Sequence, residues 1–284
     1  MATEITGPLA GAEPAGTSAA MACASSPSTS WLRRWLVLAR HTTVLLERDP
    51  GTFLAYTVMA MVLLSMLRPV YARLDPAGAG GGAGGGVPID QQAPGMAVMF
   101  TLLALDVAGQ SLLSERTWHT WDRLRAGSVG GLTVLVGKAA PLAVVFAVQQ
   151  LVLFAFADAA FGFGIAAGSW RLPLMVVLWG LCVSGIGLAV GAWTRTPGQL
   201  AAASDVGALA VTCLSGSLVP LAILPGWVGA VAPWTPGYWA LRGFQGAVEF
   251  GGHGAFPESV GVLGGITVLG FAAAWARPLV GRRG

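Results

Sequence analysis

The chain has 284 residues, of which 10% are charged and 55% are apolar, and its mean hydropathy is +0.69. An average soluble domain carries about 25% charged residues, so a water-soluble protein with this composition could not cover its surface. A lipid bilayer removes that need, because hydrocarbon is satisfied by an apolar exterior. The composition therefore predicts an all-α integral membrane protein. The net charge of +3 then reflects membrane topology, and we expect no nucleic-acid partner.

The amino-terminal residues 1–30 are rich in Ala, Ser, Thr, Pro and Gly and contain neither Lys nor Arg. A secretory signal peptide needs a basic start and an apolar run. We therefore expect a disordered cytoplasmic leader at 1–30 and a single membrane domain at 31–284. Residues 31–48 gather apolar side chains on one helical face and arginines on the other, which predicts an interfacial helix in the headgroup plane. A short cytoplasmic helix without lipid contact is the alternative.

Six apolar segments are long enough to cross about 30 Å of hydrocarbon. In chain order they are 53–71, 96–114, 132–161, 172–193, 200–224 and 260–276. The third is longer than a span needs, so we expect it to tilt or to kink at Pro141.

The distribution of Lys and Arg predicts the orientation. Twelve of the 16 lie before the first segment, between the second and third, between the fourth and fifth, or after the sixth. The positive-inside rule places that side, and with it both termini, in the cytoplasm. An even number of spans agrees with this orientation.

The outer connection 225–257 is aromatic and is broken by prolines, so it is too interrupted to span the membrane. Its Trp and Tyr residues favour the outer bilayer interface. A re-entrant hairpin buried by protein is the other possibility.

The connection 114–128, SERTWHTWDRLRAGS, is short, charged and aromatic. Trp118, Trp121 and Leu124 recur every three residues and share one face of a helix, while charged residues occupy much of the rest. Such a helix can dock into a groove on a soluble partner. An ordinary connection, whose arginines only hold the orientation, is the alternative, and the pattern alone leaves both open.

This connection resembles the segment between the second and third spans of type 2 ABC exporter permeases. That segment runs E-R-E-x-G-T-φ-E-x-L, with φ apolar, and a Gly-Lys pair follows in the next helix. The matching residues are Glu115, Arg116, Thr120, Trp121, Asp122 and Leu124, with Gly137 and Lys138 downstream. Thr117 and His119 depart from the pattern. The resemblance implies an ATPase-coupling helix over 115–124, which also contains Trp118 and Arg123.

Two further stretches are similar to the same family and occur in the family order. Arg48-Asp49-Pro50 resembles the R-D-P motif that precedes the first span. The run that begins at Ser215 resembles the family's stretch around spans five and six. The residues that match in the outer segment are Pro220, Leu221, Leu224, Pro225, Trp227, Pro236, Tyr238 and Trp239.

The resemblance implies a division of labour in a bacterial plasma membrane. Two six-span permease subunits, identical or different, would pair around a pathway for a hydrophobic or amphipathic cargo such as a drug, antibiotic or lipid. Separate ABC ATPase subunits would drive export, so the permease itself would be no enzyme and would hold no cofactor. The sequence itself also argues against ATP binding by this chain. A Walker A loop requires G-x-x-x-x-G-K-[ST]. Around Gly137-Lys138, Leu132 stands in place of the first glycine and Ala139 in place of the hydroxyl residue.

Polar side chains inside spans are costly in lipid and often functional. Asp106 and Gln110 in the second segment, and Gln149 and Gln150 in the third, are the predicted substrate-pathway residues. Hydrogen bonding between helices is the alternative. We expect Asp158 and Asp205, which lie near segment ends, to reach the interface instead.

Two GxxxG patterns permit close helix packing, within one subunit or between two. They are Gly187-x-x-x-Gly191 and Gly261-x-x-x-Gly265.

Other functional classes are less favoured. A proton-driven secondary transporter could use Asp106 or Asp205, but the chain has few spans and no recognisable internal repeat. An intramembrane hydrolase is disfavoured because the three histidines lie outside the spans and no HExxH or GxSG motif occurs. No metal-binding spacing occurs either, and we expect no metal.

Overall fold

The computed structural model describes residues 51–74, 89–117, 131–162, 170–248 and 255–280. All of its regular elements in these ranges are helical, which confirms the all-α prediction for this part of the chain. The predicted leader, the interfacial helix and Arg48-Asp49-Pro50 lie outside the described residues, as does the part of the connection from 118 to 128.

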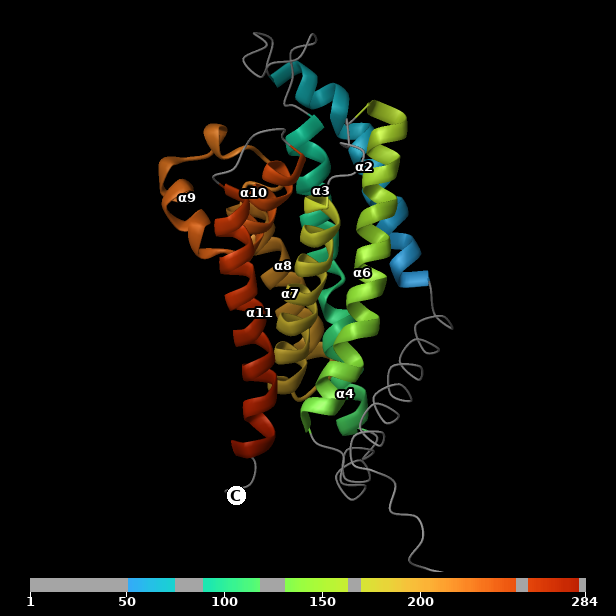
Figure 1. The fold of residues 1–284 in the computed structure, drawn as a ribbon, viewed down its shortest axis with the longest axis vertical. Coiled ribbons are helices and arrows are strands. Elements are labelled where there is room, and N and C mark those ends of the chain that lie inside the picture. The colour runs from blue at the N-terminus through green and yellow to red at the C-terminus, as the bar shows by residue number, and fades with distance from the viewer. Residues whose placement is uncertain (1–50, 75–88, 118–130, 163–169, 249–254, 281–284) are drawn as a thin grey trace, which may run out of the picture.

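The longer helices of the described residues pack into one bundle (Figure 1). They are α2 Gly51–Leu74, α3 Ile89–Leu103, α4 Leu105–Thr117, α6 Gly131–Phe161, α7 Arg171–Trp193, α8 Pro197–Leu214, α10 Pro236–Val248 and α11 Ala255–Val280. Three short pieces connect α8 to α10: η1 Leu221–Ile223, α9 Gly226–Val231 and η2 Ala232–Trp234.

Four helical stretches of the described chain are long and apolar enough to cross a membrane. They are Gln91–Ser114, which joins α3 and α4, then Leu135–Phe161, Arg171–Trp193 and Phe256–Ala276. Phe53–Pro69 in α2 is a shorter apolar helix. Helix α8 carries Asp205 and Gln199 and is not among the four. A multi-pass membrane protein follows from these helices, and the predicted six crossings correspond to α2, α3–α4, α6, α7, α8 and α11.

Successive helices alternate in direction, because two contacts between each packed pair fix whether the two run parallel or antiparallel. Helices α2 and α6 run one way, α4, α7 and α11 run the other way, and α8 runs opposite to α3–α4. The contacts are, for α2 with α6, Phe53–Phe146 and Arg68–Phe161; for α4 with α7, Leu105–Gly187 and Gly109–Gly191; and for α6 with α7, Ala143–Gly180 and Gln150–Val176. For α7 with α11 they are Arg171–Phe256 and Trp193–Ala273, and for α3–α4 with the α8 region they are Gly95–Ser217 and Gly109–Leu200.

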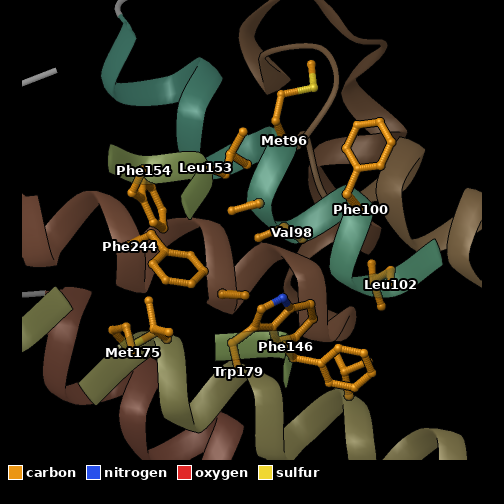
Figure 2. Packing of buried hydrophobic residues seen from close by; sticks show 14 of the residues in the cluster. Met96, Val98, Phe100, Leu102, Phe146, Leu153, Phe154, Met175, Trp179 and Phe244 are labelled. Carbon is orange, nitrogen blue, oxygen red and sulfur yellow. The ribbon is translucent and has the colours of Figure 1, made fainter. Parts of the chain in front are cut away.

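Helix α7 is the centre of the bundle, in contact with α4, α6, α10 and α11. Its Trp179 is fully buried beside Phe146 of α6 (Figure 2). Nearby, the rings of Phe154 and Phe244 lie 5.4 Å apart and join α6 to α10. Because aromatic side chains bury large areas and pack in tilted pairs, these contacts hold helices that are distant in sequence.

The predicted fifth segment is wrong at its end, since α8 stops at Leu214 rather than at 224. Gly216 has a φ of +79°, a left-handed conformation that commonly ends helices at glycine. Pro220 then begins the turn into η1. The residues from 215 to 224 are apolar enough to extend the predicted segment, but α8 does not continue through them.

The second segment also differs from its prediction, because it begins earlier and is interrupted at Ala104. The amide of Ala104 donates to the Phe100 carbonyl at 3.2 Å, and the Val107 amide donates to the Ala104 carbonyl at 3.2 Å. The second bond spans three residues instead of four, so the helix tightens there before α4 begins.

Candidate functional site

Asp106 lies in the first turn of α4, directly after the interruption at Ala104. Gln110, one turn later, donates from Nε2 to Asp106 Oδ2 at 2.8 Å. Asp106 is half-buried and Gln110 is exposed. The structure therefore brings this predicted pair together at the surface of the bundle.

Two residues that the sequence did not assign to the pathway lie near Asp106. Tyr56 of α2 lies within range of the charges of Asp106 and Asp205, and the two carboxylates, which repel each other, lie within range of one another. Asp205 is exposed and lies at the middle of α8, not toward its end, because α8 stops at Leu214. Recognising Gly216 as a helix terminator would have given this position from the sequence.

Together these four side chains form what we term the polar face: Tyr56, Asp106, Gln110 and Asp205. They come from three helices, α2, α4 and α8. Close to Asp205 on α8, the apolar side chains of Val206 and Leu209 are 68% and 57% exposed. The face thus combines two carboxylates, an amide and a phenol with apolar surroundings, which suits contact with water or with an amphipathic molecule.

The other predicted pathway pair, Gln149 and Gln150 of α6, is buried within the bundle. Gln150 donates from Nε2 to the carbonyls of Phe146 at 3.2 Å and of Val176 at 3.5 Å. The second bond joins α6 to α7, as the alternative of inter-helix bonding expected. Among the residues that the structure describes, the Oε1 atoms of both glutamines have no hydrogen-bond partner.

The two predicted pairs lie at different depths of the bundle. Asp106 follows Leu105, which packs on Gly187, whereas Gln150 bonds to Val176. These two α7 residues are separated by eleven positions, or about 16 Å along a helix. The structure therefore places Gln149 and Gln150 in the core, away from the polar face.

The first GxxxG pattern forms the contact between α4 and α7. A Cβ atom added at Gly187 would lie 2.6 Å from the Leu105 carbonyl oxygen, and one at Gly191 would lie 2.3 Å from that of Gly109. The two helices approach so closely that only hydrogen fits. Gly261 and Gly265 of the second pattern, in contrast, have no atom of the described part of the chain within 4 Å of such a Cβ.

Lys138 joins α4 to α6 beside the connection between them. It is buried, with 6% exposure, and its Nζ donates to the Ser111 carbonyl oxygen at 2.5 Å. Glu115 and Arg116 belong to the last turn of α4. The remaining residues of the predicted coupling helix, Trp118, Thr120, Trp121, Asp122, Arg123 and Leu124, lie outside the described residues.

The outer segment, from Pro220 to Trp239, is divided by its prolines, as the sequence pattern indicates. Pro220 precedes η1, Pro225 precedes α9 and Pro236 opens α10, positions where a missing amide costs no helical hydrogen bond. Trp227 is 64% exposed, and Trp234 is 88% exposed.

Two side chains of the outer segment are held by local contacts. Trp239 donates from Nε1 to the Pro233 carbonyl at 2.7 Å. The Tyr238 ring meets the Trp239 ring edge-on at 5.4 Å and lies 5.3 Å from the Arg242 guanidinium. Aromatic rings with exposed tryptophans are typical of a membrane interface.

The helical bundle, its apolar stretches and the three motif regions define a multi-pass membrane transport protein. The family model for ABC-2 type transporters matches residues 33–248, and the chain belongs to that family. The resemblance seen in the sequence is thereby confirmed.

A relative of known designation is the linearmycin resistance permease protein LnrN of Bacillus subtilis. It is 28% identical over 186 residues, which cover 64% of this chain and 46% of the relative. The chain thus matches just under half of that protein's length.

Proposed function

We propose that this chain is the membrane subunit of an ATP-driven exporter in a bacterial plasma membrane. Six crossings, α2, α3–α4, α6, α7, α8 and α11, surround one half of a translocation pathway, and both termini are cytoplasmic. A second permease subunit, identical or related, supplies the other half. A separate ABC ATPase subunit supplies the energy, and the chain itself holds no cofactor.

The polar face carries this proposal. Asp106, Gln110 and Asp205 lie on a bundle whose other exposed side chains are largely apolar. A carboxylate facing lipid near the middle of a span costs several kcal/mol by order of magnitude. The polar face is therefore covered in the working transporter, by water in a pathway and by the second permease subunit.

The cargo that fits this face is hydrophobic or amphipathic. A polar face with exposed Val206 and Leu209 beside it offers both hydrogen bonds and apolar contact. The designation of the Bacillus relative as a resistance permease supports an antibiotic as cargo here.

The ATPase contact is proposed for residues 115–124. Helix α4 reaches Thr117 at the end of the bundle opposite the outer segment, so the connection begins on the side assigned to the cytoplasm. Exposed Trp227 and Trp234 favour an outer segment that lies at the outer bilayer interface over a re-entrant hairpin buried by protein.

The proposal is tested by co-expressing the chain with a candidate ABC ATPase subunit from the same genome and measuring efflux of linearmycin and other hydrophobic antibiotics. Asp106→Asn and Asp205→Asn should each lower efflux about tenfold, the effect of about 1.4 kcal/mol of lost interaction. Asp158→Asn, which removes an exposed carboxylate at the far end of α6, is the matched control and should retain efflux.

Three outcomes would contradict the proposal. If no ATPase copurifies with the chain, the proposed division of labour between permease and ATPase is wrong. If both Asp variants are present in the membrane in the same amount as the natural chain and still show full efflux, the polar face does not line the pathway. Efflux that collapses with an uncoupler while ATP is held constant would favour the proton-driven alternative.

A further inference from the structure

The polar face carries two carboxylates at one level of the bundle. Leu200 of α8 contacts Gly109 of α4, and the two helices run in opposite directions. Asp205 follows Leu200 by five residues, or about 8 Å along α8. Asp106 precedes Gly109 by three residues, or about 5 Å along α4. The register of the two helices therefore sets the carboxylates at nearly the same depth, within range of each other's charge.

These two carboxylates are not neutralised by a cation of the described chain. Among the side chains that the structure describes, neither Asp106 nor Asp205 takes part in an ion pair, and Asp106 accepts its hydrogen bond from the neutral Gln110. Lys138 donates to a backbone carbonyl, and Arg195 lies about three turns of helix before Asp205. Three further arginines lie over aromatic rings instead: Arg68, Arg171 and Arg242.

A buried hydroxyl lies beside the two carboxylates. Ser204 directly precedes Asp205 and is 1% exposed, and among the described residues its Oγ has no hydrogen-bond partner. Ser204 follows Leu200 by one turn, so it lies on the side of α8 that packs against α4, at the level of Asp106. Because buried polar groups are nearly always hydrogen-bonded, this hydroxyl points to a partner from outside the chain.

Positive charge is what this arrangement favours. Two carboxylates at one depth repel each other, and the repulsion is stronger where protein and lipid lower the dielectric constant. A cation beside both of them removes the repulsion and is attracted to each. The apolar side chain of Val206, which is exposed next to Asp205, offers contact to a hydrophobic body that carries such a charge.

We propose that the polar face binds cargo that carries a positive charge on an apolar body, such as a protonated or quaternary amine with hydrophobic groups. The charge lies beside Asp106 and Asp205, and the apolar body packs on Val206 and Leu209. An anionic molecule of the same size is rejected by the same carboxylates. This inference rests on the proposed export function and specifies the cargo class that the same site accepts.

Two ions that differ in the sign of their charge test this selection. Tetraphenylphosphonium and tetraphenylborate have nearly the same shape and apolar surface. The purified natural chain in nanodiscs of phosphatidylcholine should bind tetraphenylphosphonium, after the binding to empty nanodiscs is subtracted. Tetraphenylborate should show little or no such specific binding. Specific binding of both ions with equal affinity, or tighter binding of tetraphenylborate, would overturn the proposal.

Variants that change only the charge locate the binding. Asp106→Asn and Asp205→Asn should each weaken tetraphenylphosphonium binding about tenfold, because one partner of the charge contact is lost. Asp106→Glu and Asp205→Glu keep the charge and should retain most of the binding. Asp158→Asn, at the far end of α6, is the matched control and should bind as the natural chain does. Unchanged binding by the double Asn variant would place the cation elsewhere and overturn the proposal.

A competition measurement needs no variant and therefore does not depend on the folding of one. Dodecyltrimethylammonium should displace tetraphenylphosphonium from the natural chain. Dodecanol, which has the same alkyl chain without the charge, should not. Equal displacement by the two compounds would show that apolar contact alone decides binding and would overturn the proposal.

Failure of this inference can be distinguished from failure of the export function. A transporter that exports antibiotics, but whose membrane subunit binds the two tetraphenyl ions equally, keeps the export function and lacks the charge selection. A chain that binds tetraphenylphosphonium through Asp106 and Asp205, but supports no efflux with its ATPase, contradicts the export function instead.

Discussion

Single glycines have opposite surroundings in this chain although they belong to the same sequence pattern. Gly191 lies against the backbone of α4, whereas Gly265 on α11 faces open space. The pattern permits close approach in both places, but only a neighbouring helix makes use of it. The role of each glycine is therefore a property of the packed bundle.

Alanine substitutions measure this difference. Gly191→Ala should lower the free energy of unfolding by about 1–3 kcal/mol, because the added methyl overlaps the Gly109 backbone. Gly265→Ala should be neutral, or stabilising by up to about 1 kcal/mol, through higher helix propensity. Thermal unfolding in detergent gives both values. Similar losses for the two variants would mean that α11 is also covered in the purified protein.

Asp205 is the residue whose interpretation changes most. A predicted span of 200–224 puts Asp205 near the cytoplasmic end, where a carboxylate reaches water. The observed helix, Pro197–Leu214, puts it at the midpoint and within interaction range of Tyr56 and Asp106. A helix end that shifts by ten residues thus turns an expected interface residue into a candidate pathway residue.

At the scale of elements, Lys138 decides how α4 and α6 are held together beside the connection that leads from one to the other. A buried ammonium is costly unless it is paired or hydrogen-bonded. Here its bond to the Ser111 carbonyl, in the second half of α4, fastens the two helices. Because of this bond, a displacement of the connection between α4 and α6 would move both helices together.

Replacing Lys138 tests this fastening. Lys138→Met should reduce stability by about 1.5–3 kcal/mol, the value of a hydrogen bond to a charged group, and should increase hydrogen exchange over the last two turns of α4. Lys138→Arg, which keeps a donor, should recover part of the loss. Arg195→Met, which removes an exposed cation at the same end of the bundle, is the control. Unchanged exchange in Lys138→Met would show that packing alone holds α4.

At the scale of the whole molecule, the alternation of helix directions is the strongest structural support for six crossings. It includes α8, the helix whose polar residues make it the least obvious span. If α8 crosses the membrane, its two ends face opposite compartments.

Cysteine labelling tests that arrangement. Arg195→Cys and Trp234→Cys, each in a chain whose Cys23, Cys182 and Cys213 are replaced by serine, lie on either side of α8 and replace exposed residues. An impermeant maleimide applied to intact spheroplasts should label Trp234→Cys and should label Arg195→Cys only after permeabilisation. Labelling of both from outside would mean that α8 does not cross, and the reverse pattern would invert the orientation.

The sequence by itself determined the class of the protein. Scarcity of charge and the lengths of apolar runs are properties of local composition, so the all-helical membrane fold could be predicted, with the bounds of α6 and α7 correct to within one residue. The pairing of Asp106 with Gln110 is equally local, since residues four apart on a helix are neighbours.

The tertiary structure alone decided the rest. Whether Gln150 lines a pathway or bonds to Val176 depends on which helix packs beside it, and the joining of Gln91 to Gln245 spans 154 positions of chain. Hydropathy measures how well a segment suits lipid, and it cannot distinguish a side that faces lipid from one that faces another helix, since both are apolar. The membrane assignment could therefore be predicted from composition, whereas the polar face required the packed bundle.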